Sequence, residues 1–136
     1  EGILPGGGIA LLRARRVLDK VKLDNKDEQM GVDIVRSALE MPLRMIVRNA
    51  GEDDGYILNK IEESKVADYG YNILTSEFGS MLKFGLLDPL KVTRSALQNA
   101  ASIAIMVLTT EALVTDLPED KKDPSGGMGG GMPGMM

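Results

Sequence analysis

Apolar residues recur with helical spacing through the first half of the chain, which predicts four amphipathic helices. The first helix follows a glycine triplet, and the second starts among the polar residues 24–28, which include good N-cap residues. Because Pro42 lacks the N–H that a helix interior needs, the second helix should break near Glu40–Met41. A third helix then runs to Gly51, and a fourth covers roughly 53–63. We expect the second helix to direct these residues toward a core: Met30, Ile34, Val35, Ala38 and Leu39.

The middle of the chain predicts a small β-hairpin. Residues 69–75 are rich in β-prone side chains, and Gly79 and Gly85 punctuate the segment that follows. We expect a short irregular helix around Ser80–Phe84. The predicted fold class is therefore mainly α, with a minor β component.

A long helix is the clearest element of the second half. Asp88 suits the N-cap and Pro89 the first helical position, and the apolar pattern continues to about Ala112. Between residues 100 and 108 the helix is apolar almost all round, so we expect it to be buried in the centre of the domain. Residues 113–117 then alternate as a short strand that Pro118 ends.

The C-terminal segment has a different composition. Residues 119–123 are charged and predict a solvated linker, and 125–136 are almost entirely Gly and Met. Such a stretch buries too little surface to offset the entropy of ordering it, so we expect a mobile tail. Two interpretations of this tail stay open: a spacer, or an adaptable, weakly apolar surface.

Composition excludes several functional classes. The 136 residues contain no Cys and no His, which removes thiolate nucleophiles, imidazole bases and Cys- or His-based metal sites. The net charge of -4 argues against nucleic acid or an anionic membrane as the main partner. No apolar run approaches the length of a membrane span.

The glycine triplet 6–8 is the one candidate for binding chemistry that stands out. Backbone N–H groups before a helix can approach a phosphate, but the triplet lacks the Lys-Ser/Thr of a P-loop and also suits a tight turn. The acidic residues around 52–63 suit a solvated helix face. The residues alone therefore predict a helical, acidic domain with no catalytic or metal site of its own.

Several short sequence motifs, which occur in a fixed order, carry a family resemblance. They are the opening Glu1-Gly-Ile-Leu-Pro-Gly-Gly-Gly, Tyr69-Gly-Tyr-Asn, the stretch Gly85–Ser102, Thr109-Thr-Glu, Val114-Thr-Asp-Leu-Pro and the Gly-Gly-Met ending. Together they resemble the C-terminal part of a group I chaperonin subunit, the GroEL type, over the whole chain. The chain begins at Glu1 rather than Met, so we expect it to be cut from a longer protein.

The resemblance implies a domain organisation and a function. Residues 1–8 would be the end of the connection from the intermediate domain. Residues 9–118 would form the C-terminal half of the equatorial domain, a helical bundle with a hairpin and a C-terminal edge strand, and residues 119–136 would be the flexible tail. The family folds proteins with ATP in two stacked seven-membered rings of identical subunits, closed by a co-chaperonin lid. Unfolded proteins would be the substrates, and the bacterial cytoplasm or an organellar matrix the location.

The resemblance also implies half of a nucleotide site. Gly7 would lie beside the nucleotide, Asn72, Ile73 and Leu74 would wall the adenine, and Asp88 would lie near the ribose. Ile73 and Leu74 are bulkier than the alanines expected there. The family's phosphate loop, its metal-binding Asp and its water-activating carboxylate lie outside this sequence. ATP or ADP with Mg²⁺ would therefore bind tightly only to the complete subunit, and this chain alone would not hydrolyse ATP.

Two assembly surfaces follow from the same resemblance. Arg44 matches a basic residue of the ring-to-ring contact, and Glu52 and Asp53 resemble its acidic partners. The strand Leu113, Val114 and Thr115 would join a neighbouring subunit's sheet. Lys26 stands where an acid is expected, and Gly55-Tyr56 replaces a Ser-Val-like pair, so the ring contact would differ in detail or the ring would be single. The alternative hypothesis is a freestanding helical module that binds partner proteins without nucleotide.

Overall fold

A computed structural model describes residues 1–116 of the chain. Its helices are α1 (Ile9–Leu18), α2 (Lys26–Ala38), α3 (Met41–Asn49), α4 (Asp54–Glu63) and α5 (Leu90–Thr109). Its strands are β1 (Ile3–Pro5), β2 (Tyr69–Asn72), β3 (Glu77–Ser80) and β4 (Leu87–Pro89). The predicted class, mainly α with a small hairpin, is confirmed. The predicted tail, 119–136, lies outside the described residues.

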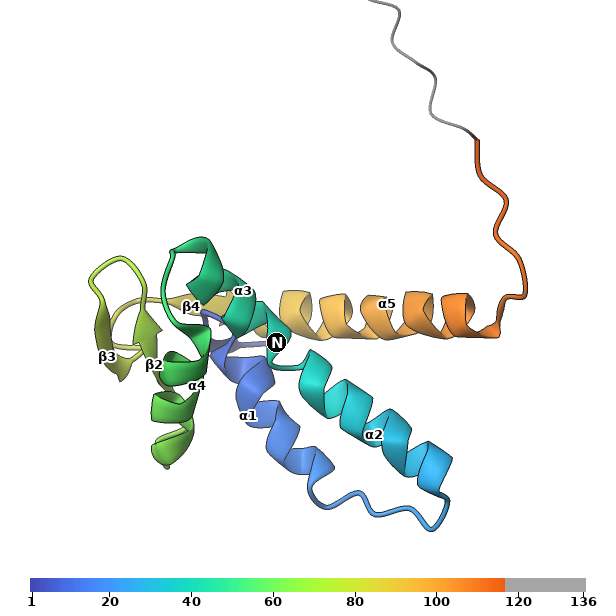
Figure 1. The fold of residues 1–136 in the computed structure, drawn as a ribbon. Coiled ribbons are helices and arrows are strands. Elements are labelled where there is room, and N and C mark those ends of the chain that lie inside the picture. The colour runs from blue at the N-terminus through green and yellow to red at the C-terminus, as the bar shows by residue number, and fades with distance from the viewer. Residues whose placement is uncertain (117–136) are drawn as a thin grey trace, which may run out of the picture.

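The four strands form two small antiparallel sheets. β2 and β3 form the predicted hairpin, with Tyr71 opposite Phe78, whereas β1 pairs with β4 across most of the chain, with Leu4 opposite Asp88. α1 and α2 lie side by side, α3 and α4 cover the hairpin end, and α5 extends away from the other elements (Figure 1). The β1–β4 pair was not predicted, because three-residue strands carry too few positions to show alternation.

The core lies between α1, α3, α4 and the hairpin. Each helix contributes residues at helical spacing, which is why the amphipathic pattern predicted these three correctly. The buried members are Ile9 and Leu12 of α1, Leu43 and Val47 of α3, Ile57, Leu58 and Ile61 of α4, Tyr71 of β2, and Met81. The predicted break at Glu40–Met41 is confirmed, with Pro42 in the first turn of α3.

Glycines allow the elements around this core to approach closely. Gly8 has a φ of 80°, and a Cβ there would lie 2.7 Å from the backbone nitrogen of Leu43. A Cβ at Gly7, whose φ is 68°, would lie 2.8 Å from the Met81 methyl group. On the other side, a Cβ at Gly70 would meet both Ile9 and Met81 at 2.7 Å. The start of α1, the start of α3 and the hairpin therefore converge because these positions lack side chains.

Two helices are far more exposed than predicted. Within its bounds α2 has no buried residue, and Met30 and Ile34 are 61% and 63% exposed, so their expected place in a core is wrong for this chain. Leu39, the C-cap residue of α2, is buried as predicted. The apolar stretch 100–108 of α5 is exposed throughout rather than buried in the domain centre. The pattern identified apolar faces correctly, but the described residues contain no element that covers them.

Three local predictions in the second half are also corrected. Asp88 does not cap α5, because Pro89 is the N-cap residue and Asp88 is held in β4 by its pairing with Leu4. Residues 81–85 form hydrogen-bonded turns rather than a short helix. Leu113, Val114 and Thr115 are exposed and form no strand within residues 1–116.

We predict that Gly8→Ala strongly destabilises the fold. A left-handed conformation costs a non-glycine residue about 1–2 kcal/mol, and overpacking against the Leu43 backbone adds about 1–3 kcal/mol. Urea denaturation of the purified protein measures the loss. The matched control is Gly31→Ala, because a Cβ at Gly31 in α2 meets nothing within 4 Å and alanine favours a helix by up to about 1 kcal/mol. Equal stability of the two variants would contradict the close-approach argument.

Candidate functional site

A cavity of about 400 Å³ lies where the glycine loop meets α3, β4 and α5. Gly7 and Gly8 line it from the loop, Ala10 and Leu11 from α1, Pro42 and Ile46 from α3, Asp88 from β4, and Val92 and Thr93 from α5. Most of the wall is backbone and aliphatic side chain. Asp88 is the one ionisable residue among those that line this cavity.

The β1–β4 ladder brings Gly7 and Asp88 together. β1 ends at Pro5, and the N–H of the next residue, Gly6, donates to the carbonyl of Leu86 at 2.9 Å. The ladder therefore holds the strand that carries Asp88 beside the loop that carries Gly7. The first-turn N–H groups of a helix lack intrahelical partners, so the start of α1 gives the same wall a partial positive charge.

The carboxylate of Asp88 has no hydrogen-bond partner within residues 1–116. Its side chain is half-buried at the cavity wall, so its oxygens are open to a ligand. A carboxylate accepts hydrogen bonds, whereas backbone N–H groups at a helix start donate to anions. The arrangement suits a ligand that offers a hydroxyl at one end and an anionic group toward the start of α1.

The turn after β2 does not line this cavity. The Oδ1 atom of Asn72 accepts from the N–H of Leu74 at 3.0 Å, which closes the turn, and Asn72 is buried. Ile73 packs against the core, and Leu74 is 89% exposed. The connection to the cavity runs through Met81, which lies against both Gly7 and Gly70. Of the five predicted nucleotide contacts, the structure thus brings Gly7 and Asp88 together.

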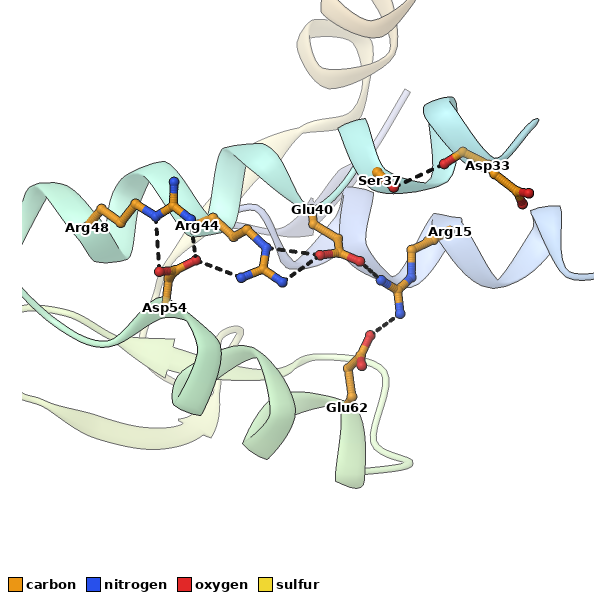
Figure 2. A network of polar contacts seen from close by, with 8 residues as sticks. All are labelled: Arg15, Asp33, Ser37, Glu40, Arg44, Arg48, Asp54 and Glu62. Atoms are coloured by element: carbon orange, nitrogen blue, oxygen red, sulfur yellow. Dashed lines mark hydrogen bonds and ion pairs between the residues drawn. The ribbon is translucent and has the colours of Figure 1, made fainter. Parts of the chain in front are cut away.

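Arg44 lies in a network of ion pairs, away from that cavity's lining (Figure 2). Its Nε and Nη2 atoms donate to Oε2 of Glu40 at 2.9 and 2.8 Å, and its Nη1 atom donates to Oδ2 of Asp54 at 2.7 Å. Arg48 also donates to Asp54, through Nε and Nη2 at 3.0 Å each. All three nitrogens of the Arg44 guanidinium are thus engaged within the chain.

The same network ties α1 to α4. Arg15 of α1 pairs with Glu40 on one side and with Glu62 of α4 on the other (Figure 2). Sequence reasoning missed this network, because Arg15 and Glu62 are 47 residues apart. The Glu40–Arg44 pair could have been found, since its i, i+4 spacing is the usual signature of a helical ion pair.

Glu52 and Asp53, the predicted acidic partners of Arg44, both have intrachain contacts. Oε1 of Glu52 accepts from the hydroxyl of Tyr71 at 3.3 Å. Oδ1 of Asp53 accepts from the N–H of Tyr56 at 3.0 Å and so caps α4. Both side chains stay exposed, so each retains an oxygen that faces solvent.

Residues 1–116 contain no group of three or more acidic side chains placed to hold a metal ion. None of the helices in this part of the chain combines the length and the apolar character needed to cross a bilayer.

Asp54 gives the network a predicted pH dependence. Hydrogen bonds from Arg48 and Arg44 lower the pKa of Asp54 from 3.8 to about 2. Because the folded-state pKa is depressed, the stabilisation is present above the unfolded pKa and is lost as the pH falls through the folded one. We predict that Asp54→Asn lowers the free energy of unfolding at neutral pH, and that the difference from wild type shrinks between pH 3.8 and about 2.

Urea denaturation across that pH range measures this difference. The control is Asp24→Asn, which removes an exposed carboxylate that has no ion pair in the described chain. If the loss of unfolding free energy in Asp54→Asn stays constant down to the lowest pH, the charge of Asp54 is not its cause.

Two comparisons with known proteins agree on the fold. The sequence profile described as the TCP-1/cpn60 chaperonin family matches residues 1–118. Among solved structures, the chain is similar to the open-state monomer of a group II chaperonin from Methanococcoides burtonii, with 24% identity and a TM-score of 0.70. The match covers 79% of this chain and 28% of that one, so this chain spans under a third of the length of the structure that it matches.

Proposed function

Because the chain belongs to the TCP-1/cpn60 chaperonin family, we propose that it is the C-terminal half of the equatorial domain of an ATP-dependent protein-folding subunit. The single observation that carries the nucleotide part of this proposal is the position of Gly7 and Asp88 in one cavity. They are 81 positions apart in the sequence, and the resemblance assigned both to the nucleotide. A freestanding interaction module gives no reason for the two to meet.

The cavity suits the sugar side of a nucleotide. Asp88 presents an open carboxylate that can accept from a ribose hydroxyl, and the aliphatic wall excludes water from that bond. Gly7 and Gly8 line the same cavity. The turn Asn72, Ile73 and Leu74 remains the proposed adenine wall. Leu74 is 89% exposed, and Met81 lies between the glycine loop and β2, the strand that leads into this turn.

The phosphate side of the nucleotide site is proposed to come from elsewhere in the complete subunit. ATP supplies the transferable phosphoryl group, and Mg²⁺ neutralises its charge when both are bound. The part proposed for this chain is to bind and orient the sugar and to exclude water, through Asp88 and the aliphatic wall of the cavity. Hydrolysis is accordingly an activity of the whole subunit.

The finer assignment within the family is group I. This assignment rests on the order of the sequence motifs and on the Gly-Gly-Met ending. The similar solved structure belongs to group II and supports the fold alone. Identical subunits in seven-membered rings, a co-chaperonin lid and unfolded protein substrates go with this assignment. So does a bacterial cytoplasmic or organellar location.

Exposed apolar segments support assembly with further polypeptide. Along α5, Ile103, Met106 and Leu108 are 57%, 55% and 84% exposed, which suits a helix covered by the remainder of the subunit. Leu113, Val114 and Thr115 follow α5 and are also exposed, so they are free to add to a neighbouring subunit's sheet. The α3–α4 corner, residues 48–56, is proposed as the ring-to-ring surface.

The nucleotide proposal is tested with Asp88→Ala in the complete subunit. Loss of a hydrogen bond to a charged group costs about 1.5–3 kcal/mol, so ADP should bind about 10–100-fold more weakly. Isothermal titration calorimetry with ADP measures the change, and Asp24→Ala is the control because its side chain is exposed and lies outside the cavity. Unchanged ADP affinity in Asp88→Ala would remove Asp88 from the site.

A further inference from the structure

We propose that Arg48 is the cation through which the α3–α4 corner contacts a second copy of this chain, with Glu52 of the partner subunit as its acceptor. The inference rests on the proposed ring-to-ring role of this corner and deepens it. It assigns the contact to a residue that the family resemblance did not single out. The predicted role of Arg44 in the same contact stays a prediction.

Arg44 has little capacity left for a partner. Its three nitrogens donate to Glu40 and Asp54 at 2.7–2.9 Å, and its side chain is 25% exposed. A new intersubunit bond at full strength would require the guanidinium to give up part of this arrangement. Figure 2 shows Arg44 held between the two carboxylates.

Arg48 is placed differently on the same helix. Its side chain is 52% exposed, and its Nη1 atom has no hydrogen-bond partner among residues 1–116. Figure 2 shows this nitrogen pointing away from Asp54. The two hydrogen bonds to Asp54 already hold the Arg48 guanidinium in place. Binding of a partner would therefore cost less side-chain conformational entropy.

The corner is self-complementary in charge. Glu52 follows Arg48 by four residues, is exposed, and is held through Oε1 by the hydroxyl of Tyr71. Two copies related by a two-fold axis present the same patch to each other, so each Arg48 can face Glu52 of the partner subunit. One intersubunit pair formed in this way is repeated by symmetry.

An exposed aromatic residue adds an apolar contact at the same place. Tyr56 lies in the first turn of α4, four residues after Glu52, and is 60% exposed. Its ring packs edge-on against Phe78 with 6.3 Å between centroids, which leaves the rest of the ring open. Tyrosine and arginine are enriched in the cores of protein interfaces. A second copy of the chain offers the matching charges and the matching ring.

The test uses charge reversal in the complete subunit, with particle mass measured by analytical ultracentrifugation at moderate salt. The wild type is expected as a two-ring particle. Arg48→Glu should halve the particle mass, and Glu52→Arg should do the same while leaving the Arg48–Asp54 bonds in place. The double variant Arg48→Glu with Glu52→Arg should restore the two-ring mass. Lys65→Glu, an exposed change of equal charge beyond the far end of α4, should leave it unchanged.

The outcomes separate this inference from the proposed function. Two-ring particles in both single variants overturn the role of Arg48 and leave the chaperonin assignment intact. A wild type that forms only single rings also overturns the inference. A wild type that forms no ring, or a complete subunit that binds no ADP, overturns the proposed function as well.

Discussion

Gly8 turns the chain with a positive φ against the backbone of Leu43, at the point where α1 and α3 both begin. A side chain there would push apart the two helices that hold the centre of the core. Gly7 and Gly70 repeat the same constraint on either side of the buried Met81. Because interiors are packed without spare volume, these missing side chains set the distances between α1, α3 and the hairpin.

The chain uses its carboxylates in two different ways. Glu40, Asp54 and Glu62 are paired with arginines in a network that joins α1, α3 and α4, and this network fixes the framework. Asp88 has no such partner and lines a cavity with an aliphatic wall. A carboxylate left open beside a glycine loop and a helix start is poorly explained by stability, since it gains no internal bond. Binding explains it better.

Much of the fold could be predicted from the sequence, because the spacing of apolar residues and the positions of Pro and Gly determine secondary structure locally. The helical pattern and Pro42 placed the first four helices, and the β-prone run placed the hairpin. The prediction that Asp88 caps a helix is wrong, because Asp88 pairs in β4 with Leu4, a residue 84 positions earlier in the sequence. The spacing of apolar residues identified the apolar faces of α2 and α5. It does not identify the element that packs against such a face.

The candidate site was predictable only through the family resemblance. Gly7 and Asp88 carry no local signature of a ligand, and the ladder that brings them together consists of three-residue strands. The ion-pair network had one local sign, the spacing of Glu40 and Arg44, while its other links join distant helices. Local patterns thus determine elements, whereas the site depends on how distant elements meet.

In the proposed nucleotide pocket, the glycine loop and β4 form one side. Its sharpest test is hydrogen exchange of the complete subunit, measured with and without ADP, because bound nucleotide slows exchange of the backbone N–H groups that it covers or rigidifies. ADP-dependent protection is expected in the glycine loop with the start of α1 and in β4, together. Protection confined to other segments, with these two unchanged, would exclude this pocket.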